Sequence, residues 1–145
     1  MYTTLITASQ LQKLLSNKEQ QHAEPSPKRF MVFDCSFDLA KPEAGAAMFA
    51  QSHIVGAVHA DLDRHLSTSL SQPRCSGGRH PLPTRERFAE WLSEIGFEND
   101  MQAVVYDRQG VNYCGRLWWM LKWAGHEAVA VLDGGLQAWQ AAGGA

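Results

Sequence analysis

The segment 104–121 constrains the fold of this chain more than any other. It opens with the apolar run Val104 to Tyr106, which is typical of a strand buried on both faces. A short loop follows from Asp107, and then a stretch rich in bulky apolar residues that indicates a helix. A strand, a tight loop and a helix in this order direct loop amides and a helix N-terminus at one point, which makes an anion site. Enzymes often place a nucleophile on the first loop residue, and here that residue is Asp107 rather than Cys or Ser.

The rest of the chain alternates between predicted strands and predicted helices. Thr7 and Thr84 are suitable N-caps, and Gly96 and Gly125 are suitable helix ends. This alternation predicts an α/β fold, with a parallel sheet covered by helices on both faces. We expect loops at 17–29 and 61–83, strands at 30–34, 56–60, 103–106 and 128–132, and helices at 8–15, 42–51, 84–95, 113–123 and 136–142.

Composition narrows the class of protein. The 145 residues suit a single domain, and a hydrophobic fraction of 45% with 19% charged residues is typical of a soluble globular protein. A net charge of −2 gives no basic surface for nucleic acid, and no apolar run is long enough to cross a membrane. Three cysteines without C-x-x-C spacing argue against disulfides or structural zinc. We therefore expect free thiols, a reducing cytoplasmic compartment, and no metal or cofactor.

The loop that begins at Asp107 has two interpretations. It is either the remnant of an active-site loop, or its carboxylate accepts hydrogen bonds from the loop amides and fills the anion site itself. We expect the second, because a carboxylate suits such a site and stabilises it by ~0.3–1 kcal/mol. Cys114 lies near the helix N-terminus, where a thiol can be reactive, so a displaced nucleophile is an alternative. One turn into a helix, however, the thiol should point into the packing, and we expect a small buried hydrophobe.

Other polar and aromatic residues carry weaker signals. Arg116 opens the helix and could pair with Asp107 or with a carboxylate across a domain interface. Trp118 and Trp119 point in different directions on a helix; one could face a partner, but we expect both in the core. The turn Asp133-Gly134-Gly135 is expected to be scaffold, with glycine supplying positive φ.

A polar cluster could bind a metal, but its spacing matches no known motif. Its members are His53, His59, Asp61, Asp63 and His65.

Three segments together resemble one family. The segment 104–139, VVYDRQGVNYCGRLWWMLKWAGHEAVAVLDGGLQAW, is similar to the N-terminal, non-catalytic domain of two-domain rhodaneses, and so are 52–63 and 80–83. These enzymes are thiosulfate and 3-mercaptopyruvate sulfurtransferases. The resemblance implies a three-layer fold around a five-stranded, mainly parallel sheet, with a fifth strand near Leu5-Ile6. It also implies that the catalytic half carries, at the position of Asp107, a Cys that forms a persulfide.

The resemblance implies roles and partners as well. Residues 1–145 would be one rhodanese domain, catalytically silent alone, with the catalytic C-terminal domain absent from this chain. That domain and a small sulfur-containing substrate would be its partners. Asp63 and His80 would reach the active site between the domains, for positioning or proton transfer; the alternative is a surface Asp and a surface His in a loop. Two other hypotheses stay open: a free-standing binding or regulatory module for a protein or anionic ligand, and a thiol enzyme that uses Cys114.

Overall fold

The computed structural model describes residues 1–20, 30–69 and 71–145, with the side chains of residues 17–20 left aside. Strands and helices alternate along these residues, as the sequence predicts. The strands are β1 (Leu5–Ile6), β2 (Phe30–Asp34), β3 (Val58–His59), β4 (Gln102–Tyr106) and β5 (Val129–Leu132). The helices are α1 (Ala8–Gln20), α2 (Ala44–Gln51), α3 (Arg85–Glu94), α4 (Cys114–Trp123) and α5 (Gly135–Ala141).

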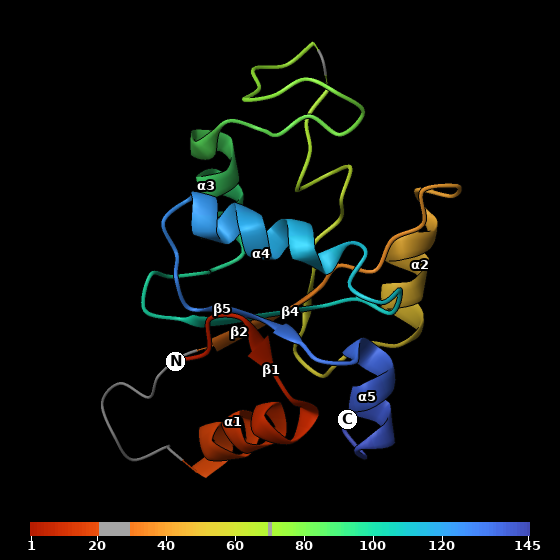
Figure 1. Ribbon diagram of the computed structural model, residues 1–145, viewed down its shortest axis with the longest axis vertical. Helices are drawn as coiled ribbons and strands as arrows, with labels where there is room; N and C mark the ends of the chain where they lie inside the picture. The colour runs from red at the N-terminus through yellow and green to blue at the C-terminus, as the bar shows by residue number, and fades with distance from the viewer. Residues whose placement is uncertain (21–29, 70) are drawn as a thin grey trace.

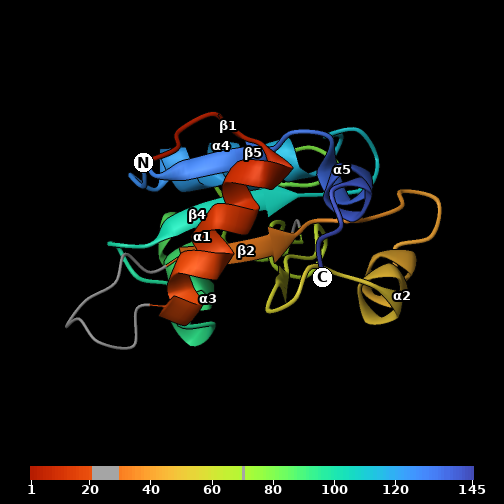
Figure 2. The same cartoon turned by 90° about the horizontal axis from the view of Figure 1, so that it is seen from below.

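The strands form one sheet in the order β1-β5-β4-β2-β3, and every neighbouring pair is parallel. Helices α3 and α4 lie on one face of the sheet, and α1 and α5 lie on the other (Figures 1 and 2). The predicted three-layer α/β fold with five strands is therefore confirmed, including the short strand at Leu5–Ile6. None of the helices in the described ranges is long and apolar enough to cross a membrane.

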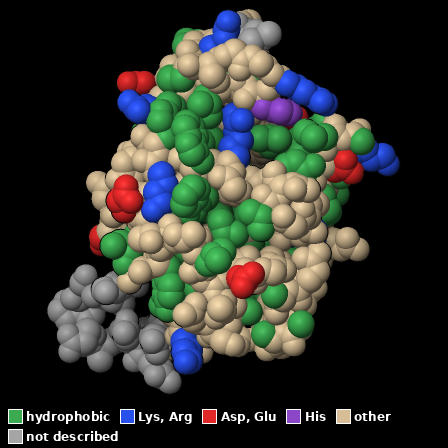
Figure 3. Space-filling model, in the orientation of Figure 1, with side chains coloured by type: hydrophobic (Ala, Val, Ile, Leu, Met, Phe, Trp, Pro, Cys, Tyr) green, Lys and Arg blue, Asp and Glu red, His purple; other side chains and the backbone are tan. Residues whose placement is uncertain are grey.

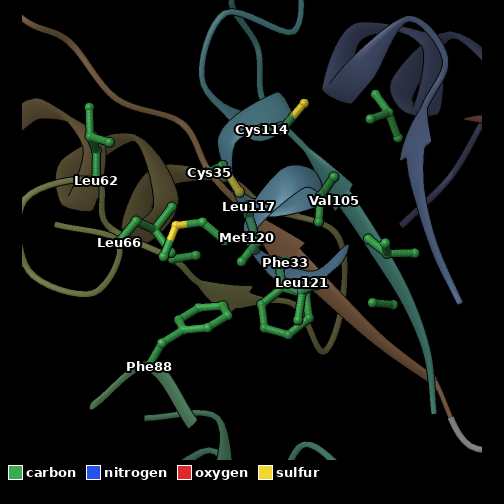
Figure 4. Close-up of a cluster of buried hydrophobic side chains, with 14 of the residues drawn as sticks. Phe33, Cys35, Leu62, Leu66, Phe88, Val105, Cys114, Leu117, Met120 and Leu121 are labelled. Atoms are coloured by element: carbon green, nitrogen blue, oxygen red, sulfur yellow. The ribbon is translucent and has the colours of Figure 1, made fainter. Parts of the chain in front are cut away.

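Alternate strand residues pack into two separate cores. Phe33 and Val105 point to the α3 and α4 side, whereas Val32 and Val104 point to the α1 and α5 side. All four are buried, which explains why these strands are apolar throughout. Figure 4 shows the first core, where α4 packs on β2 and β4. This packing fixes the carboxyl ends of the two central strands, where the candidate site lies. The residues of this first core that Figure 4 labels include Phe33, Phe88, Val105, Leu117, Met120 and Leu121.

The element bounds differ from prediction in a few places. Helix α1 runs to Gln20 rather than residue 15, because 17–20 contain Lys, Glu and Gln, which have high helix propensity. The rest of that predicted loop, 21–29, lies outside the described residues. Strand β3 is shorter than 56–60, because Gly56 turns the chain at φ +79° before it. The predicted caps are confirmed: the Thr7 hydroxyl accepts from the Gln10 N–H, and that of Thr84 from the Arg87 N–H.

Candidate functional site

The loop after β4 closes around its own first residue. The Asp107 carboxylate is 2% exposed and accepts four backbone hydrogen bonds. Its Oδ1 accepts from Gln109 and Val111, both at 3.0 Å. Its Oδ2 accepts from Tyr113 at 2.9 Å and from Cys114 at 3.0 Å. The expectation that the carboxylate fills the anion site is thus confirmed, and we call these four N–H groups with their loop the nest.

The nest requires an unusual backbone. Gly110 and Val111 both have positive φ, +69° and +72°, in consecutive positions. Glycine adopts this conformation freely, but the Cβ of a β-branched residue there costs about 1–2 kcal/mol. The left-handed turn directs the Val111 N–H at Asp107 Oδ1. The nest therefore holds a strained residue in place, and the side chain of that residue is 43% exposed.

The turn after β5 supports the backbone of Asp107. The Leu136 N–H donates to the Asp107 carbonyl at 3.1 Å. Gly135 has φ +61°, and a Cβ there would lie 2.4 Å from the same carbonyl oxygen. No side chain fits at this position without moving the start of the nest. The prediction of a scaffold turn at Asp133-Gly134-Gly135 is confirmed, and glycine is required both for positive φ and for the close approach of two loops.

Cys114 is buried between the α4 core and the Asp107 carboxylate. It is 1% exposed and belongs to the α4 core with Cys35. Burial raises the pKa of the Cys114 thiol, and the nearby Asp107 charge raises it further. Burial also raises the pKa of Cys35 well above its ordinary value. Both thiols are therefore protonated at neutral pH and behave as small apolar groups, in contrast to the exposed Cys75.

A buried ion pair beneath the nest is a feature that sequence reasoning missed. Arg108 donates to Asp34 Oδ2 at 2.9 Å, to Ser36 Oγ at 2.8 Å and to the Ser52 carbonyl at 2.9 Å. Asp34 is fully buried and also accepts from the Tyr106 hydroxyl at 2.9 Å. Burial, with the Asp34 charge next, raises the pKa of that hydroxyl. The signal that could have revealed this ion pair is the parallel register of β2 and β4, which places Asp34 beside Tyr106 at the ends of adjacent strands.

Asp63 and His80, which the resemblance singled out, meet in the structure. His80 Nδ1 lies 3.2 Å from Asp63 Oδ1 across the long loop 61–83. His80 Nε2 is buried and has no hydrogen-bond partner among the described residues. The imidazole is thus oriented by a carboxylate through one nitrogen, while its other nitrogen has no bonding role among the residues described.

Arg116 holds this loop against α4. Its guanidinium donates to the Leu66 carbonyl at 2.8 Å and to the His80 carbonyl at 2.9 Å. Of the two partners considered for Arg116, Asp107 is not the one it binds: four amides already surround the Asp107 carboxylate, and Arg116 points to the loop instead. Burial lowers the pKa of Arg116 from its ordinary value. In this domain Arg116 fixes the position of the loop that carries His80.

The polar cluster near β3 does not gather into a metal site within the described residues. His53 and His59 both stack on Phe49, with ring centroids 3.9 Å and 5.3 Å away. His65 stacks on Trp91 at 4.9 Å. The strand ends at residue 59, so the alternation that would have aligned these side chains does not continue. The two carboxylates of the cluster, Asp61 and Asp63, bind the loop backbone and His80 respectively.

The two adjacent tryptophans of α4 differ in environment. Trp118 packs at the edge of the core and donates its Nε1–H to the Thr3 carbonyl at 3.1 Å. Trp119 is 46% exposed and stacks on Trp123. The expectation that both lie in the core is wrong. Only one side of α4 faces the sheet, and consecutive helix residues lie about 100° apart around the axis.

Comparison with known proteins defines the class. A family model described as a rhodanese-like domain matches residues 7–142, and this chain belongs to that family. Over 140 residues it is 41% identical to a probable 3-mercaptopyruvate sulfurtransferase of Pseudomonas aeruginosa, covering 96% of this chain and 45% of the relative. Over 124 residues it is 35% identical to the human 3-mercaptopyruvate sulfurtransferase, covering 83% of this chain and 40% of the relative.

A solved structure agrees with these relatives. The 3-mercaptopyruvate sulfurtransferase from Leishmania major superposes with a TM-score of 0.80 at 28% identity, covering 99% of this chain and 35% of that one. The chain is thus homologous to 3-mercaptopyruvate sulfurtransferases. It spans less than half the length of these relatives.

Proposed function

We propose that this chain is the N-terminal, non-catalytic domain of a two-domain sulfurtransferase that uses 3-mercaptopyruvate or thiosulfate. The observation that carries the proposal is the Asp107 carboxylate in the nest, bound by four backbone N–H groups. Three relatives that are similar in sequence or fold bear the name 3-mercaptopyruvate sulfurtransferase, in one case as probable, and are more than twice as long as the matched segment.

The chemistry of sulfur transfer explains why the nest matters. A persulfide forms when a thiolate attacks the transferable sulfur of the donor: the S–S bond of thiosulfate breaks and sulfite leaves, or the C–S bond of 3-mercaptopyruvate breaks and the enolate of pyruvate leaves. Nest amides stabilise the negative sulfur of the persulfide. Asp107 supplies a carboxylate at that position, which is not a sulfur nucleophile and which repels anionic donors. Cys114 is buried and protonated, so it does not substitute. The persulfide therefore forms on a Cys of the second domain, and this domain buttresses it.

The Asp63 and His80 pair supplies the contribution of this domain to the active site. Asp63 orients the imidazole through Nδ1, at 3.2 Å, and leaves Nε2 without a partner in the part of the chain that the structure describes. Because Nε2 is buried, docking of the second domain has to shift the 61–83 loop before Nε2 can accept a hydrogen bond from that domain or exchange a proton with the substrate. Arg116 donates to the backbone carbonyl of His80 and so keeps this histidine in place. His80 is thus a positioning or proton-transfer residue in the intact enzyme.

A chimaera tests this function. Residues 1–145 replace the matching 140-residue segment of the Pseudomonas aeruginosa relative, and transfer of sulfur from 3-mercaptopyruvate to cyanide is measured. We expect the chimaera to be active and the isolated chain to be inactive. We also expect His80→Asn to lower kcat of the chimaera. The matched control is Val55→Ala, which should leave kcat unchanged: Val55 is exposed, and its N–H donates to the carbonyl of Ala145, away from His80 in the fold.

Two results would contradict the proposal. An inactive but folded chimaera would favour the alternative, a free-standing binding or regulatory module. An active isolated chain would favour the thiol enzyme. The form of the alternative in which an anionic ligand occupies the loop is disfavoured, because the carboxylate of Asp107 already takes the four donors that such a ligand needs.

A further inference from the structure

A line of residues runs along the outer side of α4, and we call it the α4 stripe: Val111, Gly115, Trp119 and Trp123. The spacing of four places the three helical members above one another on one side of the helix. Val111 joins the line at its N-terminal end, since its Cγ1 lies 3.9 Å from where a Cβ on Gly115 would be. The Trp119 and Trp123 rings stack with centroids 5.8 Å apart. Figure 3 shows hydrophobic side chains gathered on the face where α4 lies in Figure 1.

Two members of the α4 stripe expose apolar side chains to solvent. Val111 is 43% exposed and Trp119 is 46% exposed. Val111 is also held at φ +72°, where Gly or Asn would give the same backbone with less strain. A strained residue that presents an isopropyl group to solvent breaks local sequence preference, and such positions concentrate at binding and functional sites.

The α4 stripe carries no side chain at Gly115, and we call the space this leaves between Val111 and Trp119 the Gly115 recess. Gly115 has no Cβ, and the space that a Cβ would enter contacts only the Val111 side chain within 4 Å. Val111 and Trp119 flank this position on either side along the helix. A protruding apolar side chain of a partner can therefore enter between them and contact the helix backbone, as a knob enters a hole.

Charge limits what can cover the α4 stripe. The Arg85 guanidinium lies 4.9 Å from the centroid of the Trp123 ring and forms no ion pair within the described residues. Lys122, above the neighbouring Trp118 ring, is already paired with Glu127 at 3.3 Å. A complementary partner surface is thus apolar and carries one carboxylate for Arg85.

We propose that the α4 stripe is the surface on which the second domain of the sulfurtransferase docks, with an apolar side chain in the Gly115 recess and a carboxylate on Arg85. This inference rests on the proposed function. The relatives contain as much chain again beyond the matched segment, which supplies the occupant. Arg116, next to Gly115 in α4, holds the His80 carbonyl, so a domain that covers His80 reaches the start of the α4 stripe.

The test uses two substitutions that the isolated domain should tolerate. Gly115→Gln fills the recess with a better helix former, and Trp119→Gln removes the exposed ring. Each is made in the chimaera with the Pseudomonas aeruginosa relative and in residues 1–145 alone. The matched control is Val55→Gln. Val55 is apolar and 61% exposed, and in space it lies beside Ala145, to whose carbonyl its N–H donates.

In the isolated domain we expect Gly115→Gln not to lower the unfolding midpoint, and Trp119→Gln to lower it only slightly through loss of the Trp123 stack. In the chimaera we expect them to split one cooperative unfolding transition into two, and to lower sulfur transfer by about tenfold or more, because misplaced domains misplace reacting groups. Val55→Gln should change neither. A chimaera in which both stripe variants unfold and react as wild type would overturn the inference.

The two proposals fail differently. If the wild-type chimaera unfolds in one transition but transfers no sulfur, the proposed function fails. The effect of Gly115→Gln and Trp119→Gln on that transition then still decides whether the α4 stripe is the docking surface. If the two halves of the wild-type chimaera unfold independently, no docking occurs and the inference is wrong.

Discussion

Replacing Asp107 with Asn should destabilise the domain severely, although the two side chains have the same shape. The carboxylate accepts four backbone hydrogen bonds at 2.9–3.0 Å, two on each oxygen. An amide keeps one oxygen and turns the other into a donor that faces two N–H groups. Two hydrogen bonds to a charged group are lost, at about 1.5–3 kcal/mol each, so we expect a loss of roughly 3–6 kcal/mol.

Urea unfolding followed by circular dichroism measures this loss. Asp133→Asn is the control, because Asp133 follows the adjacent strand β5 but its side chain is exposed. A loss of 3–6 kcal/mol is a large part of the 5–15 kcal/mol typical of a domain, so the midpoint should move far or the domain should not fold. If Asp107→Asn unfolded within about 0.5 kcal/mol of Asp133→Asn, the nest would not depend on the carboxylate, and our reasoning would be refuted.

Three further predictions concern the same region. Val111→Gly should stabilise the isolated domain by about 0.5–1 kcal/mol in urea unfolding, because relief of left-handed strain exceeds the backbone entropy cost; a loss of stability would contradict this. Iodoacetamide should alkylate Cys75 quickly in the native chain and Cys35 and Cys114 only on unfolding, by peptide mass spectrometry; rapid native labelling of Cys114 would contradict its burial. Burial lowers the pKa of His65 from 6.5, so the unfolded chain binds more protons, and stability should fall as pH drops below about 6.5. This fall should be smaller in His65→Asn, and equal pH profiles would refute the assignment.

The parts of the fold that local signals specify could be predicted from the sequence. Thr7 and Thr84 occupy cap positions, and both caps form. The apolar run through Val104 predicts a strand buried on both faces, which it is. Asp107 follows that strand directly and begins a loop of amides, so the filled nest was also predictable. For the caps and the nest, the determining partners lie within a few residues along the chain.

The contacts that were missed depend on distant partners. Arg108 binds Asp34 and Ser52, which are 74 and 56 residues away. The sheet register brings Asp34 close, and the position of the C-terminal end of α2 brings Ser52 close. Arg116 points to loop carbonyls that no sequence pattern reveals. The meeting of Asp63 and His80 likewise depends on the path of an irregular loop. Side-chain chemistry identified several of these residues as candidates, but not the partners that they would find.

The most direct test of the central claim is whether residues 1–145 can carry sulfur. The chain is incubated with 3-mercaptopyruvate or thiosulfate, analysed by intact-protein mass spectrometry, and assayed for sulfur transfer to cyanide. With Asp107 in the nest and Cys114 buried, we predict no added sulfur atom and no turnover above a protein-free control. A cyanide-labile sulfur on Cys114, with turnover that Cys114→Ser abolishes, would contradict the claim that this domain is non-catalytic.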